Sequence, residues 1–390
     1  MNVLSLFDGI SCGRVALENL RADVTNYYAC EIDKYATSVS KKNYPDIKRL
    51  GDINDWETWD LDFAKIDLIL AGFPCQAWSA AGNQQGVADE RGKLVYRLID
   101  IHKKVRQVNP NVKFLFENVR MKKSHLNFIN DLFECEPIEI NSARVSAQSR
   151  VRNYWTNIAS EATQPEDLNV HLKDILESGW INSDKSYWVG ASKRGRYVSA
   201  RQVGRKLNAD GKRDDYNPNI KIVQRLELRG DEKSNCLTTV QKDSLLALKI
   251  DPTFCEQPSN KTEGCTKVGG VSDKPLRIGH FNKGSQGDRV YSTKGKSVCL
   301  SAQSGGKGGK TGLYYVELPD GEYIVRKLTP IECERLQTLP DDYTKLGIQN
   351  GTEVVVSNSQ RYKMLGNGWT VKVIEHLLKP FVETFNKNRV

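Results

Sequence analysis

The stretch IDLILAGFPCQAWS (residues 66–79) decides the fold. Residues 66–71 form an apolar run of strand length that Gly72 stops, so we expect a buried parallel strand there. Pro74 ends ladder pairing because its nitrogen carries no hydrogen. Cys75 is therefore predicted at the carboxyl end of a central strand, where open α/β sheets bind their ligands. A thiol there is a candidate nucleophile, although free cysteines are more often small core residues.

Length, hydropathy and cysteine usage limit which classes of protein this chain can belong to. A chain of 390 residues exceeds the usual size of one domain, so two domains are expected. The sequence predicts neither a signal peptide nor a membrane span, because no basic start precedes an apolar stretch and no apolar run reaches membrane length. Its 9 cysteines are scattered without a CxxC pair, which argues against a metal site and fits a reducing cytoplasm.

The positive charge is concentrated in one segment. Residues 180–327 hold 27 Lys and Arg against 16 Asp and Glu, a surplus of 11, although the whole chain has a net charge of +9. The rest of the chain is therefore slightly acidic. A polyanionic partner for this segment is the favoured interpretation, and an ordinary solvated basic surface is the alternative.

Upstream of residue 66, the sequence predicts β/α units with polar turns. A strand at 2–7, a turn containing Gly9 and a following helix resemble the first unit of a nucleotide-binding α/β domain. The next strand, 26–30, ends at Glu31, which is placed to accept hydrogen bonds from ribose hydroxyls or is simply an acid before a helix. Asp52 follows in a third turn, where it is placed to meet an adenine amino group while Ile53 packs on the ring.

Downstream of residue 71, further polar residues are expected near Cys75. Residues 79–93 predict a long loop, interpreted as a lid, before a helical pattern at 94–105. Glu117 ends the strand 112–116 and is either a partner of Cys75 at the same sheet edge or a helix-entry acid. Arg150 and Arg152 alternate along an extended segment, so both are predicted on one face, suited to an anion, a polar base edge or a surface ion pair.

The middle of the chain has a different character. Helical periodicity fades between 160 and 325, where two related β units predict strands at 244–250 and 312–318. Helices return at 330, with Thr329 as the N-cap, and again at 371–386 after the turn GNGWT.

Taken in order, these stretches resemble the DNA cytosine-5 methyltransferase family. The motifs are LSLFDGISCG (4–13), Glu31, Asp52, GFPCQ (72–76), FENV (116–119), QSRVR (148–152) and GNGWT (366–370). Their sequences look most similar to those of the animal de novo methyltransferase branch. The resemblance implies an α/β, Rossmann-like S-adenosylmethionine-dependent methyltransferase domain made of residues 1–160 plus 326–390. It also implies a smaller, mostly β or irregular target-recognition domain, residues 161–325.

The resemblance further implies methyl transfer from S-adenosylmethionine, leaving S-adenosylhomocysteine, to carbon 5 of a cytosine flipped out of duplex DNA at a short specific sequence. The expected intermediate is a covalent bond between Cys75 and carbon 6. The implied catalytic residues are Cys75, Glu117, Arg150 and Arg152, and those contacting cytosine are Phe73, Gln76, Ser79 and Asn118. The implied cofactor-binding residues are Phe7, Asp8, Gly9, Ile10, Gly13, Glu31, Ile32, Asp52, Ile53, Gly72, Pro74, Leu94, Asn367 and Trp369.

The implied setting is a monomer on double-stranded DNA in the cytoplasm of a bacterial or phage-infected cell, with a cognate restriction endonuclease left open. Three rival interpretations remain: a tRNA cytosine methyltransferase, a catalytically inactive nucleic-acid-binding homologue, and an NAD-type oxidoreductase. The basic middle segment favours DNA over tRNA, and the joint presence of Cys75, Glu117 and the arginine pair favours catalysis. The oxidoreductase lacks its GxGxxG turn here.

Overall fold

The computed structural model describes residues 1–74, 90–158, 164–177, 188–192, 197–206, 222–228, 245–248, 273–280, 289–300, 313–317, 323–326 and 328–387. The chain divides into two compact units. Unit 1 comprises Met1–Ile175, Val298–Ser304 and Pro330–Val390, and unit 2 comprises Leu176–Ser297 and Gly305–Thr329. Among the described residues, none of the helices has both the length and the apolar character needed to cross a membrane.

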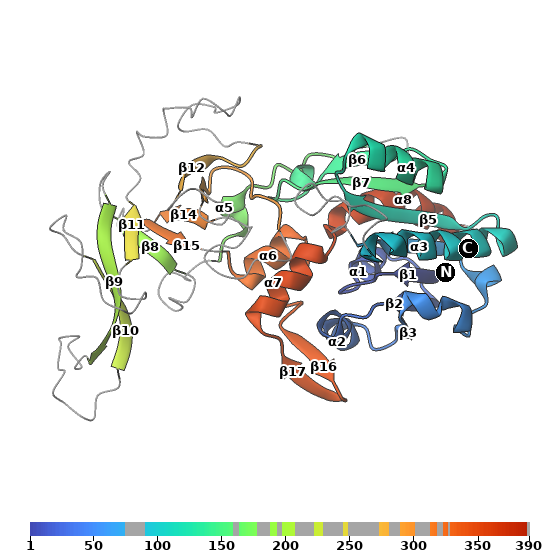
Figure 1. Ribbon diagram of the computed structural model, residues 1–390, viewed down its shortest axis with the longest axis horizontal. Coiled ribbons are helices and arrows are strands. Elements are labelled where there is room, and N and C mark those ends of the chain that lie inside the picture. Colours follow the sequence, from blue (N-terminus) through green and yellow to red (C-terminus); the bar gives the residue numbers. More distant parts are fainter. Residues whose placement is uncertain are drawn as a thin grey trace. The chain divides into compact units, whose positions relative to one another are not determined.

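Unit 1 is built on a seven-stranded sheet with the strand order β3-β2-β1-β4-β5-β7-β6 (Figure 1). The strands are β1 (Asn2–Leu6), β2 (Asn26–Cys30), β3 (Lys48–Gly51), β4 (Leu68–Gly72), β5 (Lys113–Val119), β6 (Ile138–Asn141) and β7 (Val151–Thr156). Neighbours from β3 to β5 run parallel, whereas β7 is antiparallel to both β5 and β6. The order reverses at β1, which lies between β2 and β4, so a ligand site is expected at this switch point.

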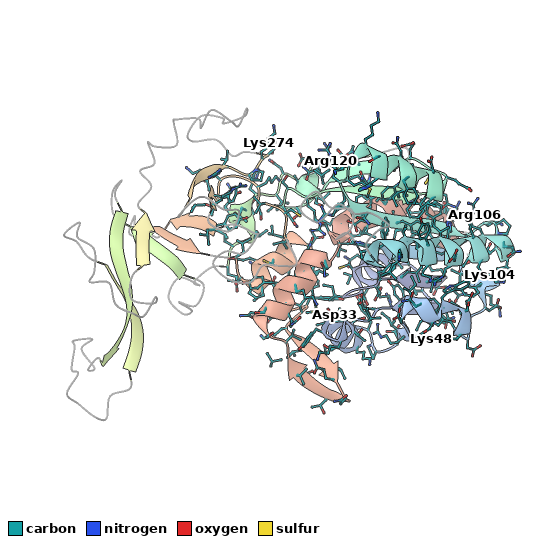
Figure 2. The ribbon with its side chains drawn as sticks, viewed as in Figure 1. Asp33, Lys48, Lys104, Arg106, Arg120 and Lys274 are labelled. Atoms are coloured by element: carbon teal, nitrogen blue, oxygen red, sulfur yellow. The ribbon has the colours of Figure 1, made fainter. Side chains whose placement is uncertain are left out.

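Helices bury both faces of the sheet. On one face, alternate residues of β1, β4 and β5 form a core with α3 (Glu90–Val108) and α4 (Lys123–Phe133). Lys104 and Arg106 lie on the exposed side of α3 (Figure 2). On the other face, α1 (Cys12–Asn19) packs close to Leu70 of β4 and contacts α8 (Val371–Lys387). Because Leu68, Leu70 and their alternating neighbours are all fully buried, β4 is the two-sided buried strand that the sequence predicts.

Unit 1 contains further helices and one hairpin besides those of the sheet and its two faces. They are α2 (Lys34–Asn43), α5 (Leu172–Ile175), α6 (Pro330–Leu336), α7 (Asn358–Asn367), a hairpin of β16 (Leu346–Gln349) and β17 (Thr352–Val355), and the 3-10 helices Ile53–Thr58, Phe63–Lys65 and Ser142–Arg144. Helix α6 begins at Pro330, where the sequence predicts a helix start, and α8 occupies the predicted 371–386. Gly366 and Asn367 form the last turn of α7 rather than a free turn before α8.

The described part of unit 2 consists mainly of strands. One sheet has the order β10-β9-β11, from Ile222–Leu228, Tyr197–Lys206 and Leu245–Leu248. The other has the order β12-β13-β14-β15-β8, from Arg277–His280, Arg289–Ser292, Leu313–Glu317, Tyr323–Arg326 and Trp188–Ser192. Strands β11 and β14 fall inside the predicted ranges 244–250 and 312–318.

The predicted fold class, a Rossmann-like α/β domain with a second mostly β domain, is therefore confirmed. One boundary is wrong: the predicted loop 79–93 runs too long, because α3 begins at Glu90. The sequence ERGKL lacks apolar spacing in its first turn, so periodicity detects the helix only from Leu94 onward. The rest of that predicted lid, 79–89, lies outside the described residues.

One buried histidine in this core has a pKa far from its usual value. His102 of α3 is 3% exposed and lies against the rings of Phe114 and Phe116, with centroid distances of 4.7 and 5.2 Å. Its Nε2 has no hydrogen-bond partner among the described residues. Burial, aided by the charge of Arg106, lowers the pKa of His102 to about 4 from 6.5.

We expect this histidine to make the protein less stable in mild acid. His102 is protonated below about pH 6.5 in the unfolded chain but only below about pH 4 in the folded protein. The free energy of unfolding therefore falls as the pH is lowered from 6.5 to 4. The expected loss relative to neutral pH is about 2 kcal/mol at pH 5. His102→Leu removes this dependence, and urea unfolding of both proteins at pH 7 and pH 5 measures it. An equal acid loss in the variant would show that other groups are responsible.

Candidate active site

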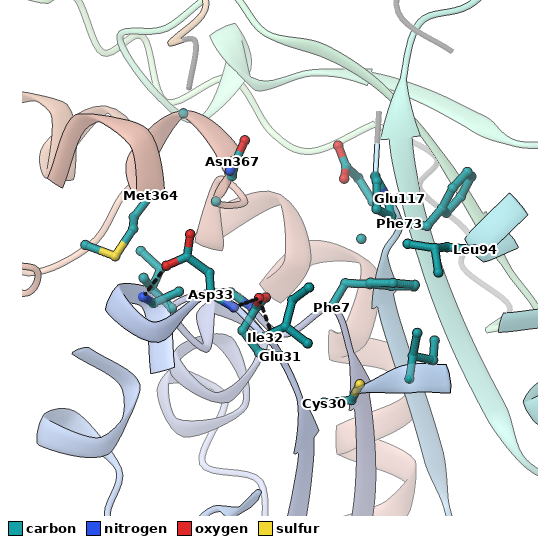
Figure 3. A pocket seen from close by; sticks show the side chains of 18 of the residues that line it. Phe7, Cys30, Glu31, Ile32, Asp33, Phe73, Leu94, Glu117, Met364 and Asn367 are labelled. Carbon is teal, nitrogen blue, oxygen red and sulfur yellow. Dashed lines mark hydrogen bonds between the residues drawn. The ribbon is translucent and has the colours of Figure 1, made fainter. Parts of the chain in front are cut away.

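A cavity of about 360 Å³ opens at the carboxyl ends of the central strands, where the strand order reverses (Figure 3). Fifteen residues predicted from the sequence line it: Phe7, Gly9, Ile10, Glu31, Ile32, Asp52, Ile53, Gly72, Phe73, Pro74, Leu94, Glu117, Arg150, Arg152 and Asn367. All of these residues belong to unit 1. The cavity therefore combines the predicted cofactor turns with the predicted catalytic acid and arginines.

The turn after β1 shapes one end of the cavity. Phe7, Gly9 and Ser11 have left-handed backbone conformations with φ of 57°, 58° and 63°. For Phe7 and Ser11, which carry side chains, this conformation costs of the order of 1 kcal/mol each. Phe7 lines the cavity, and backbone strain at such a position is typical of a ligand-binding turn.

Glu31 closes this turn from β2. Its Oε2 accepts a hydrogen bond from the Gly9 N–H at 2.9 Å, and its Oε1 accepts from the Asp33 and Ile32 N–H groups at 2.7 and 2.8 Å. Burial nevertheless raises the pKa of Glu31, although these backbone donors oppose the rise. Oε2 retains a lone pair, so the fixed carboxylate can still accept a hydrogen bond from a ligand hydroxyl.

Apolar and acidic groups flank Glu31. The Ile32 side chain is 72% exposed at the cavity, which leaves an apolar surface for a flat ligand ring. Asp52 accepts a hydrogen bond from the Asn54 N–H at 2.9 Å and caps the 3-10 helix that begins at Ile53. Figure 3 shows Glu31, Ile32 and Asp33 close together on the same side of the cavity.

Asp8 belongs to the predicted cofactor set but does not line the cavity. Its carboxylate turns inward and accepts hydrogen bonds from Ser5 at 2.6 Å and Tyr27 at 2.9 Å. Burial raises the pKa of Asp8, and these hydroxyl donors counteract the rise. The side chain therefore fixes the turn from behind.

Gly13, also in that set, contributes through packing. A Cβ at this position would come within 2.6 Å of Leu70 and 3.1 Å of the Tyr27 hydroxyl. Glycine is required because α1 packs closely on the sheet.

Glu117 lines the part of the cavity where the predicted catalytic residues lie. In the β4–β5 register it lies directly opposite Gly72, so the acid and the start of the GFPCQ loop share one sheet edge, as predicted. Arg152 of β7 forms an ion pair with it, with 3.0 Å between Nε and Oε1. Trp369 donates its indole N–H to Oε2 at 3.1 Å. The side chains of Glu117 and Arg152 are 9% and 12% exposed, so this ion pair is largely shielded from water.

Arg150 fixes the backbone around the cavity. It is 3% exposed and donates to the carbonyl oxygens of Leu300, Gly366 and Gly368 at 3.3, 3.2 and 3.0 Å. One guanidinium, from the residue just before β7, thus links this strand's start to the end of α7 and to the short segment 298–304. Both arginines line the cavity, as their alternation predicts.

Asn118 does not line the cavity but supports it. Its side-chain amide donates to the Phe73 carbonyl oxygen at 3.1 Å, and its own oxygen accepts from the Val119 N–H at 2.7 Å. The carbonyl of Phe73 is therefore fixed, with a second lone pair for another donor. Cys75, Gln76 and Ser79 lie outside the described residues, which stop at Pro74 and resume at Glu90.

Sequence reasoning missed several residues at the cavity. Cys30, Asp33, Ala36, Asn54 and Met364 also line it, as do Val119, Gly366 and Gly368, which belong to the motifs FENV and GNGWT without being among the predicted site residues. Asp33 follows Glu31 directly, caps α2 and forms an ion pair with Lys363 of α7 at 2.6 Å. The N-cap pattern at Asp33 was readable from the sequence, whereas its partner 330 positions away was not.

Cys299 is a further missed residue. Its Sγ lies 3.4 Å from Arg150 Nη1 and 3.6 Å from Arg152 Nη2. Burial alone would raise the pKa of the Cys299 thiol, but the two guanidinium charges outweigh it and hold the pKa below its usual value of 9.0. Among the described residues, no cluster of three or more His, Cys, Asp or Glu could hold a metal ion.

Comparisons with known proteins identify the family of the chain. The model of the family described as C-5 cytosine-specific DNA methylase matches residues 1–383. The Type II methyltransferase M.HhaI of Haemophilus parahaemolyticus is 30% identical over 378 residues, covering 97% of this chain and 93% of that protein. The orphan methyltransferase M.SPRI of Bacillus phage SPR is 25% identical over 448 residues, covering 99% and 98%.

Solved structures share the fold. The Entamoeba histolytica methyltransferase EhMeth has a TM-score of 0.58 at 14% identity and covers 99% of this chain and 98% of its own. The S. pombe Dnmt2 methyltransferase has a TM-score of 0.56 at 17% identity and covers 99% of each chain. At such identities the likeness shows the fold alone. The predicted similarity to the animal de novo branch stays a prediction.

Proposed function

The chain belongs to the C-5 cytosine-specific DNA methylase family, and on this premise we propose that it methylates carbon 5 of a cytosine flipped out of duplex DNA at a short specific sequence. We also propose that residues 161–325, apart from the segment 298–304 that groups with unit 1, form the target-recognition domain and that the remainder forms the catalytic domain. The observation that carries the proposal is the cavity in which Glu117, Arg150 and Arg152 meet the turns of Gly9 and Glu31.

The proposed chemistry begins with Cys75. Carbon 5 of cytosine is a poor nucleophile because the ring is electron-poor. A thiolate that forms a bond to carbon 6 pushes electrons toward carbon 5, which can then take up a methyl group. A base afterwards removes the carbon-5 proton, and the electrons left behind expel the thiolate and restore the double bond. Cys75 follows Gly72, the last residue of β4, by only three positions, and both Gly72 and Pro74 line the cavity.

Glu117 and the arginines serve the base in this proposal. Addition at carbon 6 places negative charge on the ring nitrogen N3, and a carboxyl group that supplies or shares a proton there stabilises the adduct. Arg152, which already pairs with Glu117, is assigned to the base oxygen O2. The Phe73 carbonyl, fixed by Asn118, accepts from the exocyclic amine and so rejects thymine and uracil.

The other half of the cavity fits S-adenosylmethionine. When bound, this cosubstrate supplies an electrophilic methyl group on a sulfonium sulfur. Glu31 has its carboxylate fixed by three backbone donors and keeps a lone pair for a ribose hydroxyl. The exposed Ile32 side chain offers its apolar surface to an adenine ring, and Asp52 lies on the same cavity. The acidic character of this half suits a cation.

Duplex DNA fits the charge distribution. The surplus of 11 positive charges in residues 180–327 supplies the phosphate contacts that dominate nucleic-acid affinity. The target base has to leave the helix, because neither carbon 5 nor carbon 6 is accessible to a thiol within a stacked duplex. Flipping costs a few kcal/mol of lost stacking and pairing, which contacts within the cavity have to offset.

Incubation with radiolabelled S-adenosylmethionine and either duplex DNA or tRNA tests the proposed substrate. We expect label in DNA cytosine, and bisulfite sequencing of that DNA then gives the recognition sequence. Label in tRNA alone would contradict the assignment of DNA, and label in neither would contradict the proposed activity.

A further inference from the structure

The Glu117 carboxylate is held by two different partners. Arg152 lies 3.0 Å from Oε1 and carries a charge, whereas the Trp369 indole N–H donates to Oε2 at 3.1 Å and is neutral. The partners come from β7 and from the turn between α7 and α8, which are far apart in the sequence. A carboxylate with a separate partner on each oxygen has its plane fixed, whereas one with a single partner can rotate about its last torsion.

The indole reaches Glu117 because Gly72 leaves room for it. A Cβ at Gly72 would lie 2.7 Å from the indole nitrogen and 3.2 Å from two ring carbons. Gly72 is also the residue paired with Glu117 in the sheet. The end of β4 is thus shaped to accept the Trp369 ring, which is 9% exposed and does not itself line the cavity.

We propose that Trp369 is a positioning residue for the catalytic Glu117 carboxylate. This inference rests on the proposed function, because it presumes that Glu117 acts on the cytosine ring. Trp369 acts through Glu117 and does not line the cavity. Its N–H therefore affects the chemical step rather than the binding of S-adenosylmethionine or DNA. Without the N–H, Arg152 alone of the two partners remains, and the carboxylate then spends less time in the orientation that the reaction needs.

Trp369→Phe tests the inference because it keeps an aromatic ring and removes the donor. We expect kcat to fall about tenfold, equivalent to about 1.4 kcal/mol of barrier, while KM for S-adenosylmethionine and DNA changes less than about twofold. Trp155→Phe is the matched control. Trp155 is fully buried and its indole N–H donates to the Asn130 side chain at 2.8 Å, so the control loses a similar bond that does not involve Glu117. It should lower Tm and keep kcat.

An unchanged kcat in Trp369→Phe, or an equal loss in both variants, would overturn the positioning role. A wild-type protein that methylates no cytosine would instead overturn the proposed function, and the positioning role with it.

Indole NMR provides a second readout that does not depend on turnover. The Trp369 indole ¹⁵N–¹H signal is identified by its loss in Trp369→Phe, and we expect it to shift in Glu117→Gln because the acceptor loses its charge. A signal that stays in place would show that the indole does not donate to Glu117 in solution.

Discussion

Cys75→Ser is expected to abolish methyl transfer while DNA binding persists. A serine hydroxyl is scarcely ionised at neutral pH and is a much weaker nucleophile than a thiolate toward carbon 6. Activity should fall by at least roughly 10³-fold, which corresponds to about 4 kcal/mol of barrier. DNA affinity should change little because phosphate contacts by basic residues supply most of it. Labelled methyl transfer and a DNA-binding titration measure the two effects.

Cys135→Ser is the matched control for this substitution. Cys135 is half-buried at the border of the core formed by α3 and α4, and burial raises the pKa of its thiol. The same sulfur-to-oxygen change there should leave turnover intact. Retained methyl transfer in Cys75→Ser would remove the nucleophile from the mechanism.

Glu117→Gln is expected to have the second-largest effect. Glutamine keeps the shape of the side chain and can still accept from Trp369, but it supplies no proton to N3 and gives Arg152 no opposite charge. General acid–base catalysis typically contributes roughly 10²- to 10⁴-fold, so kcat should fall by that order. Rapid-quench measurement of a single turnover reports the chemical step directly.

Glu139→Gln controls for the loss of an ion pair near the same sheet edge. Glu139 of β6 pairs with Arg120 at 2.8 Å, and their side chains are 44% and 69% exposed. Exposed pairs of this kind contribute between nothing and about 1 kcal/mol. A Glu117→Gln variant as active as the Glu139→Gln control would show that the carboxyl group has no part in the chemistry.

The sequence was sufficient to predict the elements that surround Gly72. The apolar run before it has strand length and its end is marked by Gly72 and Pro74, so local pattern alone located β4. Glu31 directly follows β2 and Glu117 lies near the carboxyl end of β5, and the structure places both at one cavity with Phe7 and Asp52. Position relative to strand ends was therefore predictable, because parallel strands share one functional edge.

Side-chain direction and long-range contacts were not predictable. Asp8 follows the first strand like a ligand-binding acid, yet Ser5 and Tyr27 draw its carboxylate inward. Trp369 stands in the closing motif, and only the three-dimensional structure brings it to Glu117, 252 positions away in the chain. Neither contact has a periodic or compositional signal, because each depends on packing between elements that are distant in sequence.

The segment around Cys299 shows the same limit for domain organisation. Composition assigns it to the basic middle of the chain, yet residues 298–304 group with unit 1, where Arg150 donates to the Leu300 carbonyl. Residues 298–304 are too few to change the overall composition of the basic middle segment that surrounds them in the sequence. Hydrogen bonds from the Arg150 side chain to Leu300 and Cys299, and from the Leu300 N–H to Gln148, connect this segment to unit 1, and composition carries no signal of them.

The covalent step is the central claim, and a mechanism-based trap tests it most directly. Duplex DNA that carries 5-fluorocytosine at the methylated position should form a stable adduct in the presence of S-adenosylmethionine, because fluorine cannot leave as a proton does and elimination of the thiolate is blocked. Denaturing electrophoresis and peptide mass spectrometry should find this DNA attached to Cys75, and Cys75→Ser should form no adduct. Turnover on ordinary cytosine without any adduct on the fluorinated base, or attachment through another residue, would contradict the mechanism.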